Sequence, residues 1–164
     1  MSCSTRPDVA GAATHCPGCG RPGRLVTRIT VKAMVRPEAL EHLKAAEHRF
    51  CASASCSVVY FGVDETLDVT AIVVPVFQKE PAGDRRVCYC LEIGEADLRQ
   101  EILKAATPTA ADRITTLVQA GRCACEVKNP QGSCCLGNVV EAAKDAKAAL
   151  DLAPRRSAAA STRG

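Results

Sequence analysis

The sequence predicts an α+β protein in which a small β-rich module precedes a helical one. In the first half, apolar residues gather in short β-branched runs, whereas in the second half they recur at the spacing of helices. A stretch rich in proline, glycine and charge, Lys79–Arg86 (KEPAGDRR), separates the two patterns. The chain has 164 residues, of which 47% are hydrophobic, so it can bury a modest core.

The β-rich module is expected to span residues 15–80, after a disordered leader at residues 1–14. Three runs show the pattern of strands: Leu25–Val35 (LVTRITVKAMV), Ser57–Val63 (SVVYFGV) and Val69–Phe77 (VTAIVVPVF). Between the first two runs, Pro37 has the position of a first helical residue and opens a helix with one apolar face.

The helical module is expected to span residues 86–153. Three segments have apolar residues at helical spacing: Glu95–Ala105, Ala110–Ala120 and about Gly137–Leu152. Gly121 has the position of a terminating glycine after the second segment, and Pro154 ends the third. Residues 154–164, rich in serine, alanine and arginine, are expected to be a disordered tail.

Eleven cysteines are far more than a domain of this size usually carries. Their number is odd, and they come in close pairs at positions 16/19, 51/56, 88/90, 123/125 and 134/135. The N-terminal sequence lacks the apolar segment of a secretory signal, and no run approaches the roughly 18 apolar residues of a membrane span. We therefore expect a cytoplasmic protein, without direct membrane insertion, whose reduced cysteines bind metals.

The formal charge of +3 does not by itself indicate a nucleic-acid-binding protein. Cysteines that bind metal are thiolates, so two four-cysteine metal sites would remove the positive balance. Aromatic residues make up only 3% of the chain, few for stacking on bases, and no basic stripe is present. For these reasons we expect no nucleic-acid binding. Because no Ser/His/Asp arrangement and no glycine-rich phosphate motif is found, we also expect no enzyme activity.

The first constellation consists of four cysteines in two pairs: Cys16, Cys19, Cys51 and Cys56. The first pair forms a C-x2-C knuckle in CPGCG, whose tight turn lets both sulfurs reach one ion. Zinc prefers four tetrahedral ligands of this soft type, so the two pairs predict a treble-clef-like zinc module. His15 and His48 lie next to the pairs and are alternative ligands.

The second half offers more cysteines than a further site needs: Cys88, Cys90, Cys123, Cys125, Cys134 and Cys135. The C-x-C pair at 88 and 90, just before a predicted helix, can bind one edge of an iron–sulfur cluster, whose anionic sulfurs nearby N–H groups would stabilise. A turn at residues 129–132 (NPQG) can fold Cys125 and Cys135 toward each other. Spacing alone does not separate a cluster from a second zinc site.

Four motifs follow one another in the chain: CPGC, FCASASC with VVYF, CYC before a helix, and CACEVKNPQGSCCLG. In this order they resemble the N-terminal domain of the archaeal-type CopZ copper chaperone family, over roughly residues 15–150. Domains of that family resemble a mononuclear zinc module joined to a [2Fe-2S] module related to bacterioferritin-associated ferredoxin.

Position by position, the resemblance implies two sets of ligands. For zinc, the set is Cys16, Cys19, Cys51 and Cys56. For the [2Fe-2S] cluster, the set is Cys88, Cys90, Cys125 and Cys135. The last two have adjacent competitors, Cys123 and Cys134.

The resemblance further implies an iron–sulfur electron-transfer protein in copper handling that supplies an electron for reduction of Cu(II) to Cu(I), with zinc as a structural ion. The implied partners are a redox partner and a copper-carrying chaperone domain or copper-transporting ATPase. Full-length members carry a further domain with a Cu(I)-binding M-x-C-x-x-C loop, where this sequence is expected to end in a tail. Two alternatives remain: a soft-metal (copper) binding or sensing module that uses spare cysteines, and a zinc-only interaction module.

Overall fold

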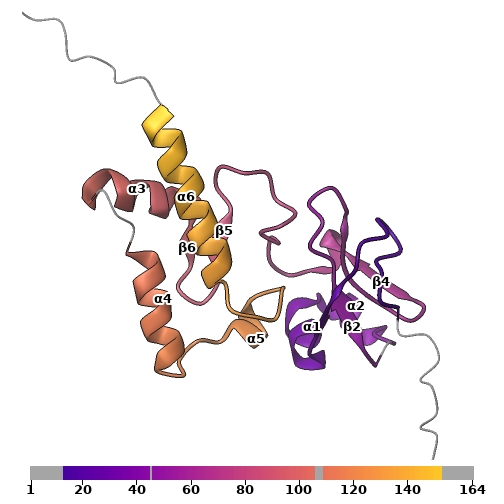
Figure 1. Ribbon diagram of the computed structural model, residues 1–164. Coiled ribbons are helices and arrows are strands. Elements are labelled where there is room, and N and C mark those ends of the chain that lie inside the picture. Colours follow the sequence, from indigo (N-terminus) through magenta and orange to yellow (C-terminus); the bar gives the residue numbers. More distant parts are fainter. Residues whose placement is uncertain (1–12, 45, 106–108, 153–164) are drawn as a thin grey trace, which may run out of the picture.

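A computed structural model describes residues 13–44, 46–105 and 109–152 of the chain. The tail predicted at residues 154–164 and most of the predicted leader lie outside the described residues. Within the described ranges the protein is α+β, as the sequence predicts, with a sheet and two short helices at one end of the molecule and a mainly helical part that includes a small hairpin at the other (Figure 1). None of the helices in these ranges is long and apolar enough to cross a membrane.

The first half is built on an antiparallel sheet, which has four strands in the described part of the chain, in the order β1-β2-β3-β4. The strands are β1 (Arg24–Val26), β2 (His48–Phe50), β3 (Val58–Gly62) and β4 (Glu65–Asp68). Strand β3 confirms the strand predicted at Ser57–Val63. It lies inside the sheet, and its first four residues are all buried, which explains why its sequence is a continuous apolar run without alternation.

The strand predicted at Leu25–Val35 is wrong beyond its first residues. Strand β1 ends at Val26, and helix α1 (Arg28–Met34) follows almost at once. Thr27 caps this helix, because its side-chain oxygen accepts a hydrogen bond from the backbone N–H of Thr30. One face of α1 is buried in the core of the sheet. This capping and packing outweigh the β-branched composition on which the prediction rested.

The strand predicted at Val69–Phe77 is also wrong. The segment starts with a 3-10 turn, η1 (Val69–Ala71), and Ile72 then forms an isolated bridge with Val35. The chain thus crosses the end of helix α1 and leaves the sheet. The helix predicted at Pro37 is confirmed as α2 (Pro37–Glu41), although it is short.

The second half consists of helices packed on a small hairpin. Its elements are β5 (Arg86–Cys88), β6 (Ile93–Gly94), α3 (Glu95–Ala105), α4 (Ala110–Gln119), α5 (Cys125–Lys128) and α6 (Leu136–Leu152). The three predicted helices are confirmed as α3, α4 and α6, nearly at their predicted bounds. Helix α6 packs against α3, α4 and β5 (Figure 1), and Leu98, Ile114 and Val139 are buried between them.

The two halves have separate hydrophobic cores and meet where helix α5 packs against helix α1 (Figure 1). The junction also contains polar contacts: Arg24 Nη2 donates a hydrogen bond of 2.8 Å to the carbonyl oxygen of Gln131. A loop of the second half that carries cysteines therefore lies against the first half.

Candidate metal centres

The first four predicted ligands lie at one end of the sheet. Cys51 directly follows β2 and Cys56 precedes β3, so the connection between these antiparallel strands carries both. Cys16 and Cys19 lie in a knuckle before β1, which pairs with β2. Two hydrogen bonds of 2.8 Å close the knuckle, from the N–H of Cys16 to the carbonyl of Arg21 and from the N–H of residue 20 to the carbonyl of Cys16.

The sulfur atoms of these four cysteines all lie within 4.8 Å of one another. Cys16 Sγ is 3.8 Å from Cys56 Sγ, and Cys19 Sγ is 3.6 Å from Cys51 Sγ. Sulfurs at about 2.3 Å from a tetrahedral zinc ion are about 3.8 Å apart, so the separations fit zinc. The knuckle leaves little room for a side chain at Gly18, since a Cβ there would lie 3.1 Å from Cys56 Sγ.

Three thiols of this centre have pKa values shifted from that of a free cysteine, in opposite directions. Burial raises the pKa of Cys16 to about 12 and also raises the pKa of Cys51. A backbone hydrogen bond from Arg21 lowers the pKa of Cys19 to about 7. Because zinc deprotonates its thiol ligands, a bound ion would replace the protons that the buried sulfurs otherwise retain.

Neither of the histidines considered as alternative ligands belongs to this group of sulfurs. Exposed His15 has its Nδ1 atom 2.9 Å from Thr14 Oγ1. The fully buried side chain of His48 has its Nε2 atom 2.7 Å from Glu65 Oε2. In the described ranges, the residues grouped closely enough to hold one metal ion are cysteines alone.

The second set of predicted ligands comes from two distant segments: Cys88, Cys90, Cys125 and Cys135. The first ends strand β5 and the second follows in the turn toward β6, whereas the third begins helix α5 and the fourth precedes helix α6. Three of the four are buried and Cys90 is half-buried. All four belong to, or pack against, the core of the helical half.

Contacts among these sulfurs link both segments. Cys90 Sγ is 3.7 Å from Cys125 Sγ, and the N–H of Ala124 donates a hydrogen bond of 3.3 Å to Cys90 Sγ. Hydrogen bonding by the Cys135 thiol lowers the pKa of Cys88 and of Cys125 to about 6. The same contacts raise the pKa of Cys135, and burial raises that of Cys90 to about 11. Here too, metal cations would displace protons shared between buried sulfurs.

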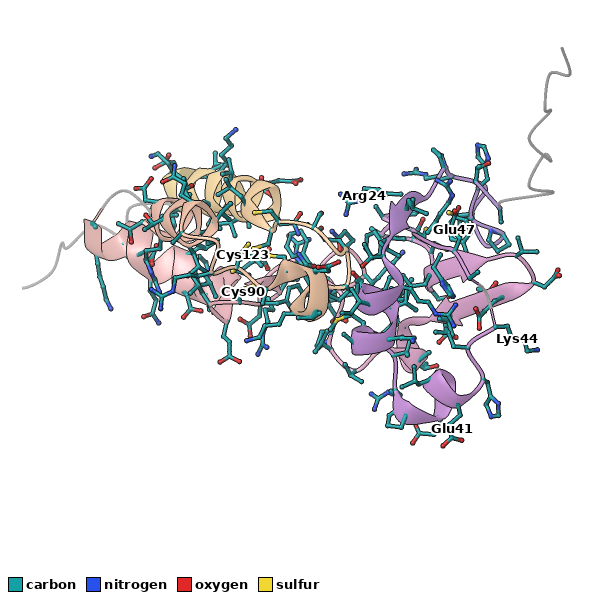
Figure 2. The ribbon with its side chains drawn as sticks, turned by 90° about the horizontal axis from the view of Figure 1, so that it is seen from below. Arg24, Glu41, Lys44, Glu47, Cys90 and Cys123 are labelled. Atoms are coloured by element: carbon teal, nitrogen blue, oxygen red, sulfur yellow. The ribbon has the colours of Figure 1, made fainter. Side chains whose placement is uncertain are left out.

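The two competing cysteines are more accessible. Cys134 is exposed, while Cys123 is half-buried and packs against the helical core. Figure 2 shows Cys90 and Cys123 close together in the view, within the helical half. The structure therefore directs Cys135 inward and leaves its neighbour Cys134 in solvent.

Sequence reasoning missed the polar residues that hold the loop at residues 129–135. Gln131 Nε2 donates a hydrogen bond of 2.9 Å to the carbonyl of Cys134. From strand β3, the buried hydroxyl of Tyr60 donates a hydrogen bond of 2.6 Å to the carbonyl of Pro130. These contacts join segments far apart in the chain, and the NPQG turn was the only sequence signal that pointed to this loop.

Tyr89 anchors the other ligand segment, between Cys88 and Cys90. Its hydroxyl donates a hydrogen bond of 2.7 Å to the carbonyl of Pro75 and accepts one of 3.0 Å from the N–H of Phe77. The stretch that connects the two halves is thus tied to the turn that carries the C-x-C pair.

Comparison with known proteins identifies the module that contains the first centre. Residues 13–73 match the model of a zinc binding domain, zf_CopZ. The matched range includes all four cysteines of the first centre. No curated protein gives a significant match to the sequence.

A solved structure resembles most of the described chain. It is the X-ray structure of the Archaeoglobus fulgidus CopZ N-terminal domain, with a TM-score of 0.63 and 29% sequence identity. The match covers 77% of this chain and 95% of the archaeal one, so it extends beyond the zinc-binding domain into the helical half. The chain thus contains a CopZ-like zinc-binding module with a cluster of four cysteines.

Proposed function

We propose that this chain is an iron–sulfur electron-transfer protein in copper handling, with a [2Fe-2S] cluster at the second cysteine set and a structural zinc ion at the first. The observation that carries the proposal is the meeting of sulfurs from two distant segments in a fold similar to the CopZ N-terminal domain. Four cysteine thiolates are the ordinary ligands of a [2Fe-2S] cluster. The proposed role is to carry electrons and metal, without enzyme activity.

The spacing within the second set supports a cluster over a second zinc ion. Cys90 and Cys125 approach to 3.7 Å, yet within the described ranges the cysteines grouped closely enough to hold one metal ion are those of the first centre, and the second set does not form such a group. A single zinc ion needs all four sulfurs in the compact range found at the first centre. A cluster with two irons takes its cysteines as two pairs, so it combines short separations within pairs with longer ones between them.

The surroundings of the second set also suit an anionic cluster. Cys88 and Cys135 are each 1% exposed, so water has little access to these sulfurs. The N–H of Ala124 already donates to Cys90 Sγ, and hydrogen bonds of this kind tune the reduction potential of iron–sulfur clusters. When bound, the cluster would supply one-electron exchange. The exposed Cys134 shows that the same loop reaches solvent, where a partner can dock.

The role in copper handling rests on the likeness to CopZ. In the proposed reaction Cu(II) accepts one electron and becomes Cu(I), and a redox partner then restores the electron to the protein. The Cu(I) formed would pass to a copper-carrying chaperone domain or a copper-transporting ATPase. We place the reaction in the cytoplasm, where thiols stay reduced.

The decisive experiment combines metal analysis with spectroscopy on anaerobically purified protein. We expect two irons and one zinc per chain, and a paramagnetic signal after reduction with dithionite. Stoichiometric Cu(II), added with a Cu(I) chelator, should abolish this signal and yield trapped Cu(I). Colourless protein with two zinc ions would refute the cluster, and loss of iron without formation of Cu(I) would refute the electron transfer.

The adjacent cysteines 134 and 135 provide a matched pair of variants for the ligand assignment. Cys135→Ala should bleach the visible absorption of the cluster, because it removes a buried sulfur that contacts both ligand segments. Cys134→Ala removes an exposed sulfur and should leave the absorption nearly unchanged. The reverse result would move the ligand to Cys134.

The zinc ion is proposed to be structural, because a closed shell of four thiolates leaves no position for water or substrate. Binding free energy of about 10–16 kcal/mol can serve as folding energy in small zinc modules. Cys19→Ser should therefore lose zinc and unfold, as measured by metal analysis and circular dichroism. The control variant Cys134→Ser should keep its zinc and its fold. A folded, zinc-free Cys19→Ser protein would contradict the structural role.

One observation favours a second function: the exposed thiol of Cys134 and the half-buried thiol of Cys123 are not needed by either proposed site. They can bind soft ions such as Cu(I) directly. This alternative predicts that Cys134→Ala weakens Cu(I) binding in a competition with a chelator while iron and zinc remain. Unchanged Cu(I) binding would exclude it.

A further inference from the structure

We infer that Gln131 is a positioning residue that turns the thiol of Cys135 toward the second set of predicted ligands and keeps the thiol of Cys134 in solvent. The two cysteines are neighbours in a loop that ends at helix α6, yet Cys135 is 1% exposed and Cys134 is exposed. Both have the same chemistry, so their different orientations must come from how the backbone between them is held.

The side chain of Gln131 holds this backbone directly. Its Nε2 atom donates hydrogen bonds to two successive carbonyls, of 3.3 Å to Ser133 and 2.9 Å to Cys134. Its Oε1 atom accepts hydrogen bonds of 2.7 Å from Gln78 Nε2 and 3.1 Å from Asn138 Nδ2. A glutamine amide has two N–H donors and two lone pairs, and all four are used. Since the Cys134 carbonyl belongs to the peptide before Cys135, fixing it fixes the side on which each thiol emerges.

Burial makes these hydrogen bonds effective. Gln131 is 6% exposed, so water does not compete for its amide group. The Ser133 carbonyl also accepts a hydrogen bond of 2.8 Å from Asn129 Nδ2, whereas Gln131 supplies the donor to the Cys134 carbonyl, so Gln131 favours the backbone orientation in which this carbonyl faces its amide. A side chain of equal length without hydrogen-bonding groups would remove this preference.

The first half supplies the frame for the amide. Gln78 Nε2 reaches Gln131 Oε1 from the stretch that connects the halves, and Arg24 on strand β1 donates to the backbone carbonyl of Gln131 at 2.8 Å. Tyr60 on strand β3 holds the preceding carbonyl, that of Pro130. The orientation of the two cysteines in the helical half is therefore set partly by residues of the zinc-binding half.

The inference has two parts that can fail separately. The inward orientation of Cys135 rests on burial and hydrogen bonds alone. Its consequence, that Gln131 selects which cysteine binds the [2Fe-2S] cluster, rests on the proposed function. The test therefore measures the reactivity of the thiols and, on the same samples, the metal content.

The experiment is alkylation of the native full chain with N-ethylmaleimide, followed by mass spectrometry that separates modification at Cys134 from modification at Cys135. In the protein without substitutions, we expect Cys134 to react at least about tenfold faster than Cys135, because the thiol of Cys134 is exposed. Gln131→Met keeps the length of the side chain but removes its hydrogen bonds, and it should lower the ratio of the two rates at least about threefold. Gln119→Met, at the exposed end of helix α4, is the matched control and should keep the ratio.

Circular dichroism and zinc content establish that each variant is folded. Gln131→Asn, which keeps the amide but shortens its reach, is the second test and should also lower the ratio. Similar rates for both thiols in the unmodified protein, or an unchanged ratio in either folded variant, would overturn the inference. Failure of both variants to fold would overturn it too, because Gln131 would then determine the fold as a whole. Absence of iron in samples that show the expected ratios would refute the cluster alone.

Discussion

The hydrogen bond from Tyr60 to Pro130 offers a direct test of how the two halves are joined. The hydroxyl of Tyr60 is fully buried, and burial raises its pKa, so it remains a donor throughout the usual pH range. Tyr60→Phe removes only the hydroxyl and leaves the ring in the core. The carbonyl of Pro130 then loses a donor at 2.6 Å in a buried position. An unsatisfied buried acceptor costs about 1–3 kcal/mol, and this is the expected loss of unfolding free energy.

Urea unfolding at fixed zinc concentration, followed by circular dichroism, measures this loss. With a slope of about 1–3 kcal/mol per molar urea, the midpoint should fall by roughly 1 M while the slope stays the same. Thr66→Val is the matched control, because it removes a hydroxyl from an exposed position on strand β4 and should change stability by less than about 0.5 kcal/mol. Equal midpoints for Tyr60→Phe and the control would refute the argument that this bond secures the ligand loop.

Three further predictions concern a carboxylate and two glycines. Although burial opposes ionisation of Glu95, hydrogen bonds from Arg85 and the backbone hold its pKa below the usual value of a glutamate. A depressed pKa adds stability above the unfolded value of about 4.3, and this stability is lost as the pH falls through the folded pKa. The difference in unfolding free energy between the unmodified protein and Glu95→Gln should therefore shrink from pH 6 to pH 3; a constant difference would count against the ion pair. Gly132 has a φ of 67°, and a Cβ there would lie 3.0 Å from Thr30 Oγ1 on helix α1, so Gly132→Ala should cost at least about 1–2 kcal/mol in thermal unfolding. Gly137 lies in helix α6 with no atom within 4 Å of an added Cβ, so Gly137→Ala should raise the free energy of unfolding by up to about 1 kcal/mol. If Gly137→Ala instead lowered stability as much as Gly132→Ala, neither the available space nor the φ angle would account for the effect at Gly132.

The sequence predicted the helical half better than the sheet half, for a physical reason. Helices α3 and α6 are long enough for several turns of apolar spacing, so periodicity alone locates them. Strands β1 and β2 have three residues each, too few to show alternation. Helix α1 was mistaken for a strand because its composition is β-branched, while its cap at Thr27 is a single side-chain contact.

The two candidate sites also differ in how well the sequence predicted them. Close pairing of cysteines along the chain predicted the grouping at the first centre, because a knuckle fixes both sulfurs locally. In the second set of predicted ligands, spacing did not separate Cys135 from its neighbour Cys134. What separates them is a network of side chains from distant segments, with Gln131 in its middle, and a pattern along the sequence carries no signal for such contacts.

The packing of the loop at residues 129–135 on the first half also has a consequence for the order in which the two halves fold. Arg24 and Gln131 are 107 positions apart, and Tyr60 and Pro130 are 70 apart. During synthesis the cysteines of the first centre, strand β3 and helix α1 leave the ribosome long before residue 130 is added, and N-terminal segments generally fold first. We therefore expect the first half to be folded when the loop of residues 129–135 is made, so that this loop packs onto a surface that has already formed.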